Sequence, residues 1–163
     1  YKNSILIGTF TPIGICFNRE KLYQHVDFDT YIKMNVAIED YPILVDLIMN
    51  TSVKTIKESL HIYRVHKTSY SHTKKLKDLL FQKKQMLHLF DYFTNKYSFN
   101  DFLVSTYYQN HYKDSLFLAG YFEDKKLGKE MVSKITSKSI KDYIHYWASQ
   151  HSFIRKSITL IKH

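Results

Sequence analysis

The pattern of apolar and polar residues changes near residue 72. Before that point, short apolar runs and period-two alternation predominate. Residues 4–17 hold two apolar runs separated by a Thr-Pro pair, a pattern that predicts a strand, a turn and a second strand. A short strand is predicted at residues 53–56, and residues 60–66 alternate as a half-buried strand does. We therefore expect strands throughout the first part of the chain.

Two helices are predicted between these strands. Asn18 is a favoured N-cap residue and begins a short helix. Asp40 is suited to the N-cap of a longer helix that ends at Asn50, and Pro42 fits its first turn because no N–H partner is needed there. Residues 27–38 are polar and aperiodic, so we expect a loop. One apolar stripe runs along the longer helix: Ile43, Leu44, Leu47 and Ile48.

Beyond residue 72 the pattern is helical. Ser98 with Asp101, and Ser139 with Asp142, have the spacing of capping boxes, so each pair predicts the start of a helix. The segment 73–93 places its apolar residues on one helical face with lysines opposite: Leu76, Leu79, Leu80, Met86, Leu87, Phe90 and Phe93.

Composition and charge support the same division. Residues 1–72 carry 8 Lys+Arg against 7 Asp+Glu, a difference of +1, whereas residues 73–163 carry 16 against 8, a difference of +8. Strands and helices in the first part favour an α/β layer, followed by an all-α extension. The basic extension either faces an anionic partner or has a solvated lysine-rich surface, and composition leaves both readings open.

Cysteine content and hydropathy narrow the class of protein. The lone Cys16 excludes a disulfide framework and a cysteine-built zinc site, which suits a reducing cytoplasm. No apolar run reaches the roughly 18 residues of a transmembrane helix, and no signal peptide is visible. The chain begins at Tyr1 rather than Met, within an apolar stretch, so we expect it to be a segment of a longer protein.

Two pairs of residues carry candidate chemistry. Glu39 and Asp40 stand where the longer helix begins, a position that acidic residues favour by about 0.3–1 kcal/mol through the helix dipole. The same position suits a general base, which needs an accessible, ionised carboxylate. Arg64 and His66 share one face of the strand predicted at 60–66 and would offer a cation and a titratable donor for a phosphate. On spacing alone, Glu39 and Asp40 either only start the helix or form part of a site, and Arg64 and His66 are either solvated surface residues or part of a site.

The sequence also contains an Asp-x-Asp pair, at Asp27 and Asp29. Such a pair can bind a divalent cation through its oxygen atoms. No apolar strand precedes this one, so we predict no metal site at these residues.

Four segments follow one another in a distinctive order: PIGICFNREKL at 12–22, FD at 28–29, EDYPILVDLI at 39–48 and YRVHKTSYSH at 63–72. In this order and spacing they resemble the C-terminal half of the family 2 glycosyltransferases, which have the GT-A fold. The resemblance implies a partial GT-A-like mixed sheet with helices over residues 1–72. Residues 73–163, a basic, all-α helical extension, match no family.

The resemblance also implies roles for the candidate residues. Asp40 would be the catalytic general base, taking a proton from the acceptor hydroxyl as it attacks the anomeric carbon with inversion. Glu39 would orient the site or the acceptor, and Arg64 and His66 would bind substrate near the nucleotide diphosphate. Two departures concern local loops: His25-Val26-Asp27 replaces glycines that often precede the family's Phe-Asp, and NTSVK replaces a glycine-containing turn after the helix.

From the resemblance we expect part of an inverting glycosyltransferase that uses a nucleotide-sugar donor and a glycan or lipid-linked acceptor, in polysaccharide biosynthesis. A divalent cation, Mg²⁺ or Mn²⁺, would be bound mainly by the absent donor-binding half, so this segment alone would be inactive and would hold no metal. We expect a cytoplasmic protein with no nucleic-acid partner, and peripheral contact with the inner face of a membrane through the tail at 152–163.

A second hypothesis comes from a different class of protein. The +8 charge and the aromatic residues of 73–163 would also suit a non-catalytic basic helical module that binds nucleic acid or a protein partner.

Overall fold

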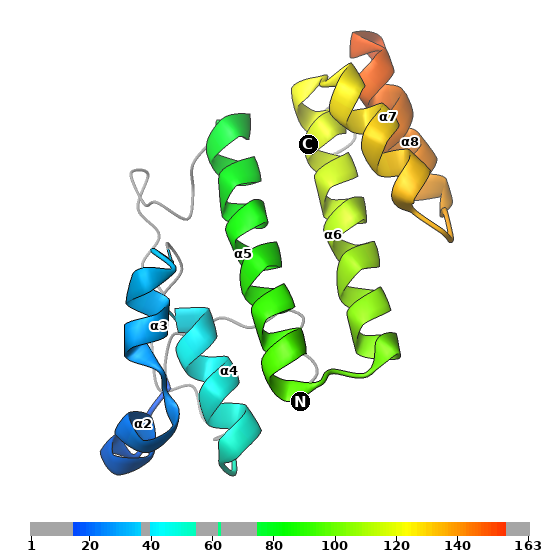
Figure 1. Cartoon of the computed structure of the whole chain (residues 1–163). Helices are drawn as coiled ribbons and strands as arrows, with labels where there is room; N and C mark the ends of the chain where they lie inside the picture. Colours follow the sequence, from blue (N-terminus) through cyan, green and yellow to red (C-terminus); the bar gives the residue numbers. More distant parts are fainter. Residues whose placement is uncertain (1–14, 37–39, 55–61, 63–74, 156–163) are drawn as a thin grey trace. The chain divides into compact units, whose positions relative to one another are not determined.

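The computed structural model describes residues 15–36, 40–54, 62 and 75–155, and every regular element in these ranges is a helix (Figure 1). The chain divides into two compact units, residues 1–100 and 101–163. The helices are α2 (Arg19–His25), α3 (Phe28–Lys33), α4 (Asp40–Asn50) and α5 (Leu76–Tyr97) in the first unit, and α6 (Asp101–Phe122), α7 (Lys125–Lys134) and α8 (Ile140–Gln150) in the second.

The prediction of an α/β fold with a partial GT-A-like mixed sheet is wrong, because the described residues contain helices and no strand. Residues 15–17 and 53–54, which were expected in strands, have no regular structure. Ile62, within the strand predicted at 60–66, also has no regular structure. The other residues of the predicted strands, and the predicted boundary after residue 72, lie outside the described residues. A short apolar run predicts a strand only if it is buried against a partner, whereas Phe17, Val53 and Ile62 are 47%, 43% and 95% exposed, respectively.

The two helices predicted before residue 72 are confirmed. Asn18 is the N-cap of α2, and its Oδ1 accepts hydrogen bonds from the backbone N–H groups of Glu20 at 2.9 Å and Lys21 at 3.2 Å. Helix α4 runs from Asp40 to Asn50, so Asp40 is its first helical residue rather than the predicted N-cap.

The loop predicted at 27–38 is wrong over its first half, which contains α3. Asp27 is the N-cap of α3: its carboxylate accepts from the backbone N–H of Thr30 at 3.1 Å and from the Thr30 hydroxyl at 2.7 Å. A helix of fewer than two full turns has too few positions to show a repeat of apolar residues. Only its N-cap, Asp27, could have indicated α3 from the sequence.

The core of the first unit lies where α4 packs against α5. Val45, Ile48, Leu89, Phe90 and Phe93 are almost fully removed from solvent. Aromatic rings of α3 and α4 surround Phe93, with edge or tilted contacts at about 6 Å that are favourable geometries for aromatic pairs. The amphipathic segment predicted at 73–93 is confirmed as α5, which extends further, to Tyr97.

The predicted capping box at Ser98 and Asp101 is wrong, because Ser98 ends α5 instead of starting α6. Ser98 has a left-handed backbone with φ of 50°, and the N–H of Phe99 donates to the Thr94 carbonyl at 3.3 Å. This is the hydrogen-bond pattern of a Schellman C-cap. Helix α6 then begins at Asp101.

In the second unit α6, α7 and α8 pack against one another (Figure 1). Leu116, Met131 and Ile135 form its buried apolar cluster. The capping box predicted at Ser139 and Asp142 is confirmed at the start of α8: Asp142 Oδ2 accepts from the Ser139 N–H at 2.7 Å, and the Ser139 Oγ accepts from the Asp142 N–H at 3.3 Å.

Candidate functional site

Asp40 is the one residue of the predicted site within the described ranges. It is the first residue of α4, and it is exposed. Glu39, Arg64 and His66 lie outside the described residues, so their predicted roles stay predictions. The position of Asp40 is accessible to a solvent-borne hydroxyl, which a general base requires.

The buried part of α4 is held by a carboxylate that was not among the candidate residues. Asp46 is fully buried. Its Oδ1 accepts from the Tyr97 hydroxyl at 2.6 Å and from the Lys96 Nζ at 2.8 Å. Its Oδ2 accepts from the Tyr31 hydroxyl and from the backbone N–H of Asp27 at 3.3 Å. One side chain of α4 is thereby bonded to α3, to the residue that caps α3, and to α5.

Lys96 provides the positive charge of this cluster. Its Nζ lies 5.3 to 6.0 Å from the centroids of the four rings of Tyr31, Tyr92, Phe93 and Tyr97. Burial by itself lowers the pKa of Lys96, but the hydrogen bond and charge of Asp46 outweigh it, so the pKa lies above its ordinary value. The ammonium therefore remains charged beside Asp46.

The two tyrosines bonded to Asp46 have raised pKa values. Burial raises the pKa of Tyr31, and the hydrogen bond to Asp46 raises it further. Burial and Asp46 also raise the pKa of Tyr97, against smaller opposing effects of Asn50 and Lys96. Asn50 Nδ2 donates to the Tyr97 hydroxyl at 2.9 Å. These hydroxyls are held as neutral donors at neutral pH, and their bonds to Asp46 join α3, α4 and α5.

The signal for Asp46 was present in the sequence. It is the one charged residue inside the apolar run from Ile43 to Ile48, and a charge there must be paired when the helix is buried. Its partners Tyr31 and Lys96 are distant in sequence, and no local pattern indicates them.

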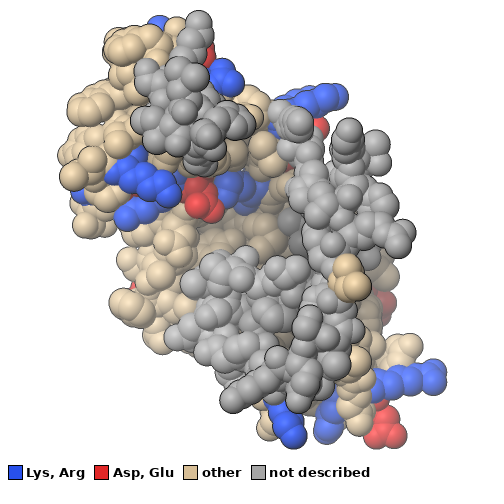
Figure 2. Space-filling model, turned by 180° about the vertical axis from the view of Figure 1, so that it is seen from behind, with Lys and Arg blue, Asp and Glu red and all other residues tan. Residues whose placement is uncertain are grey.

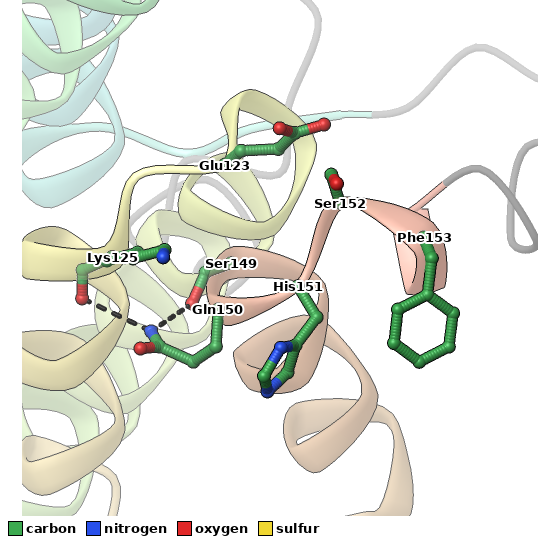
Figure 3. A pocket seen from close by; sticks show the side chains of 7 residues that line it. All are labelled: Glu123, Lys125, Ser149, Gln150, His151, Ser152 and Phe153. Atoms are coloured by element: carbon green, nitrogen blue, oxygen red, sulfur yellow. Dashed lines mark hydrogen bonds between the residues drawn. The ribbon is translucent and has the colours of Figure 1, made fainter.

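The second unit contains an open polar hollow of about 330 Å³ (Figure 3). Among the residues that line this hollow, Gln150 Nε2 donates to the Lys125 carbonyl at 3.2 Å and to Ser149 Oγ at 2.8 Å. Glu123 at the rim is paired with Arg155, Oε1 to Nη1 3.0 Å. Its other lining residues are Lys125, Ser149, His151, Ser152 and Phe153. The Gln150 bond joins the end of α8 to the first residue of α7, and the Arg155 bond joins the chain after α8 to the turn before α7. These polar groups therefore hold neighbouring segments together.

In the part of the chain that the structure describes, no group of three or more His, Cys, Asp or Glu is placed to hold a metal ion. The Asp27 carboxylate serves as an N-cap, and its hydrogen bonds from Thr30 lower its pKa.

Lys and Arg side chains lie in separate groups on the face shown in Figure 2. None of the described helices has both the length and the apolar character needed to cross a bilayer.

Comparison with protein-family models, curated proteins and solved structures finds no match for this chain. Together with the all-helical structure of the described residues, this corrects the assignment to the family 2 glycosyltransferases with a GT-A fold.

Proposed function

We propose that this chain is the acceptor-side part of a longer cytoplasmic enzyme that transfers a sugar from a nucleotide-sugar donor to an acceptor hydroxyl. The observation that carries the proposal is the exposed carboxylate of Asp40 in the first turn of α4. The proposal keeps the chemistry expected of Asp40 and leaves out the family and its mixed sheet.

The chemistry assigned to Asp40 is that of a general base. The N-terminus of a helix favours negative charge, because its first backbone N–H groups have no partner within the helix. Asp40 would accept the proton of the acceptor hydroxyl while the oxygen attacks the anomeric carbon and the nucleoside diphosphate leaves from the opposite face, with inversion. Glu39 would orient the acceptor, and Arg64 and His66 would bind near the diphosphate.

The Asp46 cluster supports this role by fixing the helix that carries Asp40. Asp46 lies six residues further along α4, and its four hydrogen bonds hold the helix to α3 and α5. A general base must lie within about 2.6–3.2 Å of the atom whose proton it takes, so a firmly held helix is an advantage. In the longer enzyme a divalent cation, Mg²⁺ or Mn²⁺, would neutralise the leaving diphosphate, bound by residues outside this chain.

The test is the substitution Asp40→Asn in the longer enzyme, with release of nucleoside diphosphate from a panel of nucleotide sugars as the assay. Loss of a general base lowers turnover by about 10²- to 10⁴-fold. Asp29→Asn is the matched control, because Asp29 is also an exposed acid in the first turn of a helix and is expected to leave turnover unchanged. Near-normal turnover of the Asp40→Asn variant would refute the assignment.

The non-catalytic alternative makes a different prediction for the same chain. A basic module for nucleic acid would bind a single-stranded oligonucleotide at low salt and release it as salt rises, because binding displaces counterions. Absence of binding at low salt would count against that alternative.

A further inference from the structure

The outward face of α8 is apolar and aromatic. Ile140, Tyr143 and Trp147 are 82%, 44% and 50% exposed, respectively. They lie at positions i, i+3 and i+7, which share one side of a helix. The rings of Tyr143 and Trp147 are neighbours, with centroids 6.2 Å apart. We call these three residues the α8 stripe.

The inner face of α8 already forms the packing of the second unit. Asp142, Ala148 and Ser149 are buried. A Cβ atom on Gly120 of α6 would lie 2.6 Å from the carbonyl oxygen of His145, so the backbones of these two helices are in close contact. The α8 stripe is therefore not part of the core of this unit. Three exposed apolar or aromatic side chains on one helix face are typical of an interaction surface.

Lysines are concentrated in the part of the sequence that leads into the stripe. Residues 125–141, which comprise α7 and the chain up to the first turn of α8, contain six lysines against one acidic residue, Glu130, a difference of +5. Glu130 is paired with Lys134 at 2.8 Å. Helix α7 packs against α8, and Lys141 directly follows Ile140 and is exposed. The surface thus combines exposed apolar side chains with a local excess of cations.

We propose that the α8 stripe and the neighbouring lysines bind the surface of an anionic phospholipid membrane. Trp and Tyr are suited to the headgroup level because their rings are amphipathic. An exposed Ile can enter the upper acyl region, and each lysine near an anionic surface adds electrostatic attraction. This inference goes beyond the proposed sugar transfer and does not depend on it.

Two other occupants fit the observations less well. Nucleic-acid bases stack on aromatic rings, but Ile140, the most exposed residue of the stripe, has no ring on which a base could stack. A second copy of the chain meeting the stripe about a two-fold axis would bring the same +5 segment against itself, and like charges in contact repel.

The tryptophan fluorescence of the chain comes from the α8 stripe alone, because Trp147 is its only tryptophan. We expect its fluorescence emission to shift to shorter wavelength with vesicles of phosphatidylcholine and phosphatidylglycerol in equal parts. Vesicles of phosphatidylcholine alone should give a much smaller shift. Raising the salt concentration should weaken binding to the anionic vesicles, since salt screens exposed charges.

Variants separate the apolar and electrostatic contributions. Ile140→Ser with Tyr143→Ser should abolish the shift while circular dichroism shows an unchanged fold, because both side chains are exposed. The matched control is Phe81→Ser with Phe102→Ser, which removes two exposed aromatic side chains from other helices and should leave the shift intact. Lys129→Gln and Lys141→Gln should each weaken binding about fivefold.

Four outcomes would overturn the proposal. They are the absence of a shift with anionic vesicles, an equal shift in the Ile140→Ser and Tyr143→Ser variant, a concentration-dependent shift without vesicles, and a shift with single-stranded oligouridylate but not with vesicles. The third outcome would assign the stripe to self-association, and the fourth would assign it to nucleic acid.

Discussion

Asp46 places a negative charge in the interior of the first unit, where an unpaired carboxylate would be strongly unfavourable. Four donors from three parts of the chain surround it, so both of its oxygens are hydrogen-bonded. Removing such a carboxylate leaves its donors without their acceptor, and the lost stability includes their desolvation.

We predict that Asp46→Ala lowers the free energy of unfolding by roughly 3 kcal/mol. This is the lower end of the range for breaking a buried ion pair, because the Lys96 side chain is 27% exposed and can turn toward water. Asp29→Ala, at an exposed position, should change stability by less than about 0.5 kcal/mol. Urea unfolding followed by circular dichroism measures both. Equal stability of the two variants would contradict the assigned role of Asp46.

Helix packing in the second unit depends on a residue without a side chain. Gly120 of α6 lies against the backbone carbonyl of His145 in α8, where a Cβ would come within 2.6 Å. Since a helix backbone cannot give way as a flexible side chain can, a larger residue at 120 must push the helices apart.

We therefore predict that Gly120→Ala destabilises the second unit by about 1–2 kcal/mol. Overpacking a tight contact costs about 1–3 kcal/mol, and the better helix propensity of Ala recovers only about 0.5–1. The control is Ser105→Ala at an exposed position of α6, which should be nearly neutral. Thermal unfolding of the two variants gives the comparison, and a stabilised Gly120→Ala protein would show that the α6–α8 contact is looser than described.

At the scale of elements, the sequence predicted features whose cause is local. Asn18 and Ser139 are the N-caps that the sequence predicted, because a cap depends on residues within three positions of it, and Asp40 is the first residue of its predicted helix. Ser98 was misread because its spacing to Asp101 mimics a capping box while its backbone ends the preceding helix. A serine near an acidic residue can therefore stand at the end of one helix or at the start of the next.

The fold class and the Asp46 cluster could not be predicted in this way. A short apolar run forms a strand only where other parts of the chain cover it, and those contacts are not local; Phe17, Val53 and Ile62 are exposed instead. Tyr31 and Lys96 lie 15 and 50 residues from Asp46 in sequence. For the site, the position of Asp40 at a helix start followed from its neighbours, whereas Arg64 and His66 stay predictions.

At the scale of the whole molecule, we expect the two units to respond differently to high pH, because the buried cluster around Asp46 lies in the first unit, whereas Lys134, whose pKa is raised in the second unit, is exposed. Burial and Asp46 raise the pKa of Tyr31 and Tyr97, and Asp46 raises that of Lys96 against the effect of burial. A raised folded-state pKa contributes stability below the unfolded-state value, here about 10, and this stability is lost as pH rises further. All three groups belong to the first unit.

We predict that raising the pH from about 8 to about 11 destabilises the first unit more than the second. Trp147 lies in the second unit, so its fluorescence follows that unit alone, while far-ultraviolet circular dichroism follows the helices of both. The urea transition seen by circular dichroism should broaden or split at high pH, with its early part absent from the fluorescence curve. In a Tyr97→Phe variant the early part should depend less on pH, because one titrating hydroxyl is gone. If the two signals coincide at every pH, the units unfold as one cooperative body and the prediction fails.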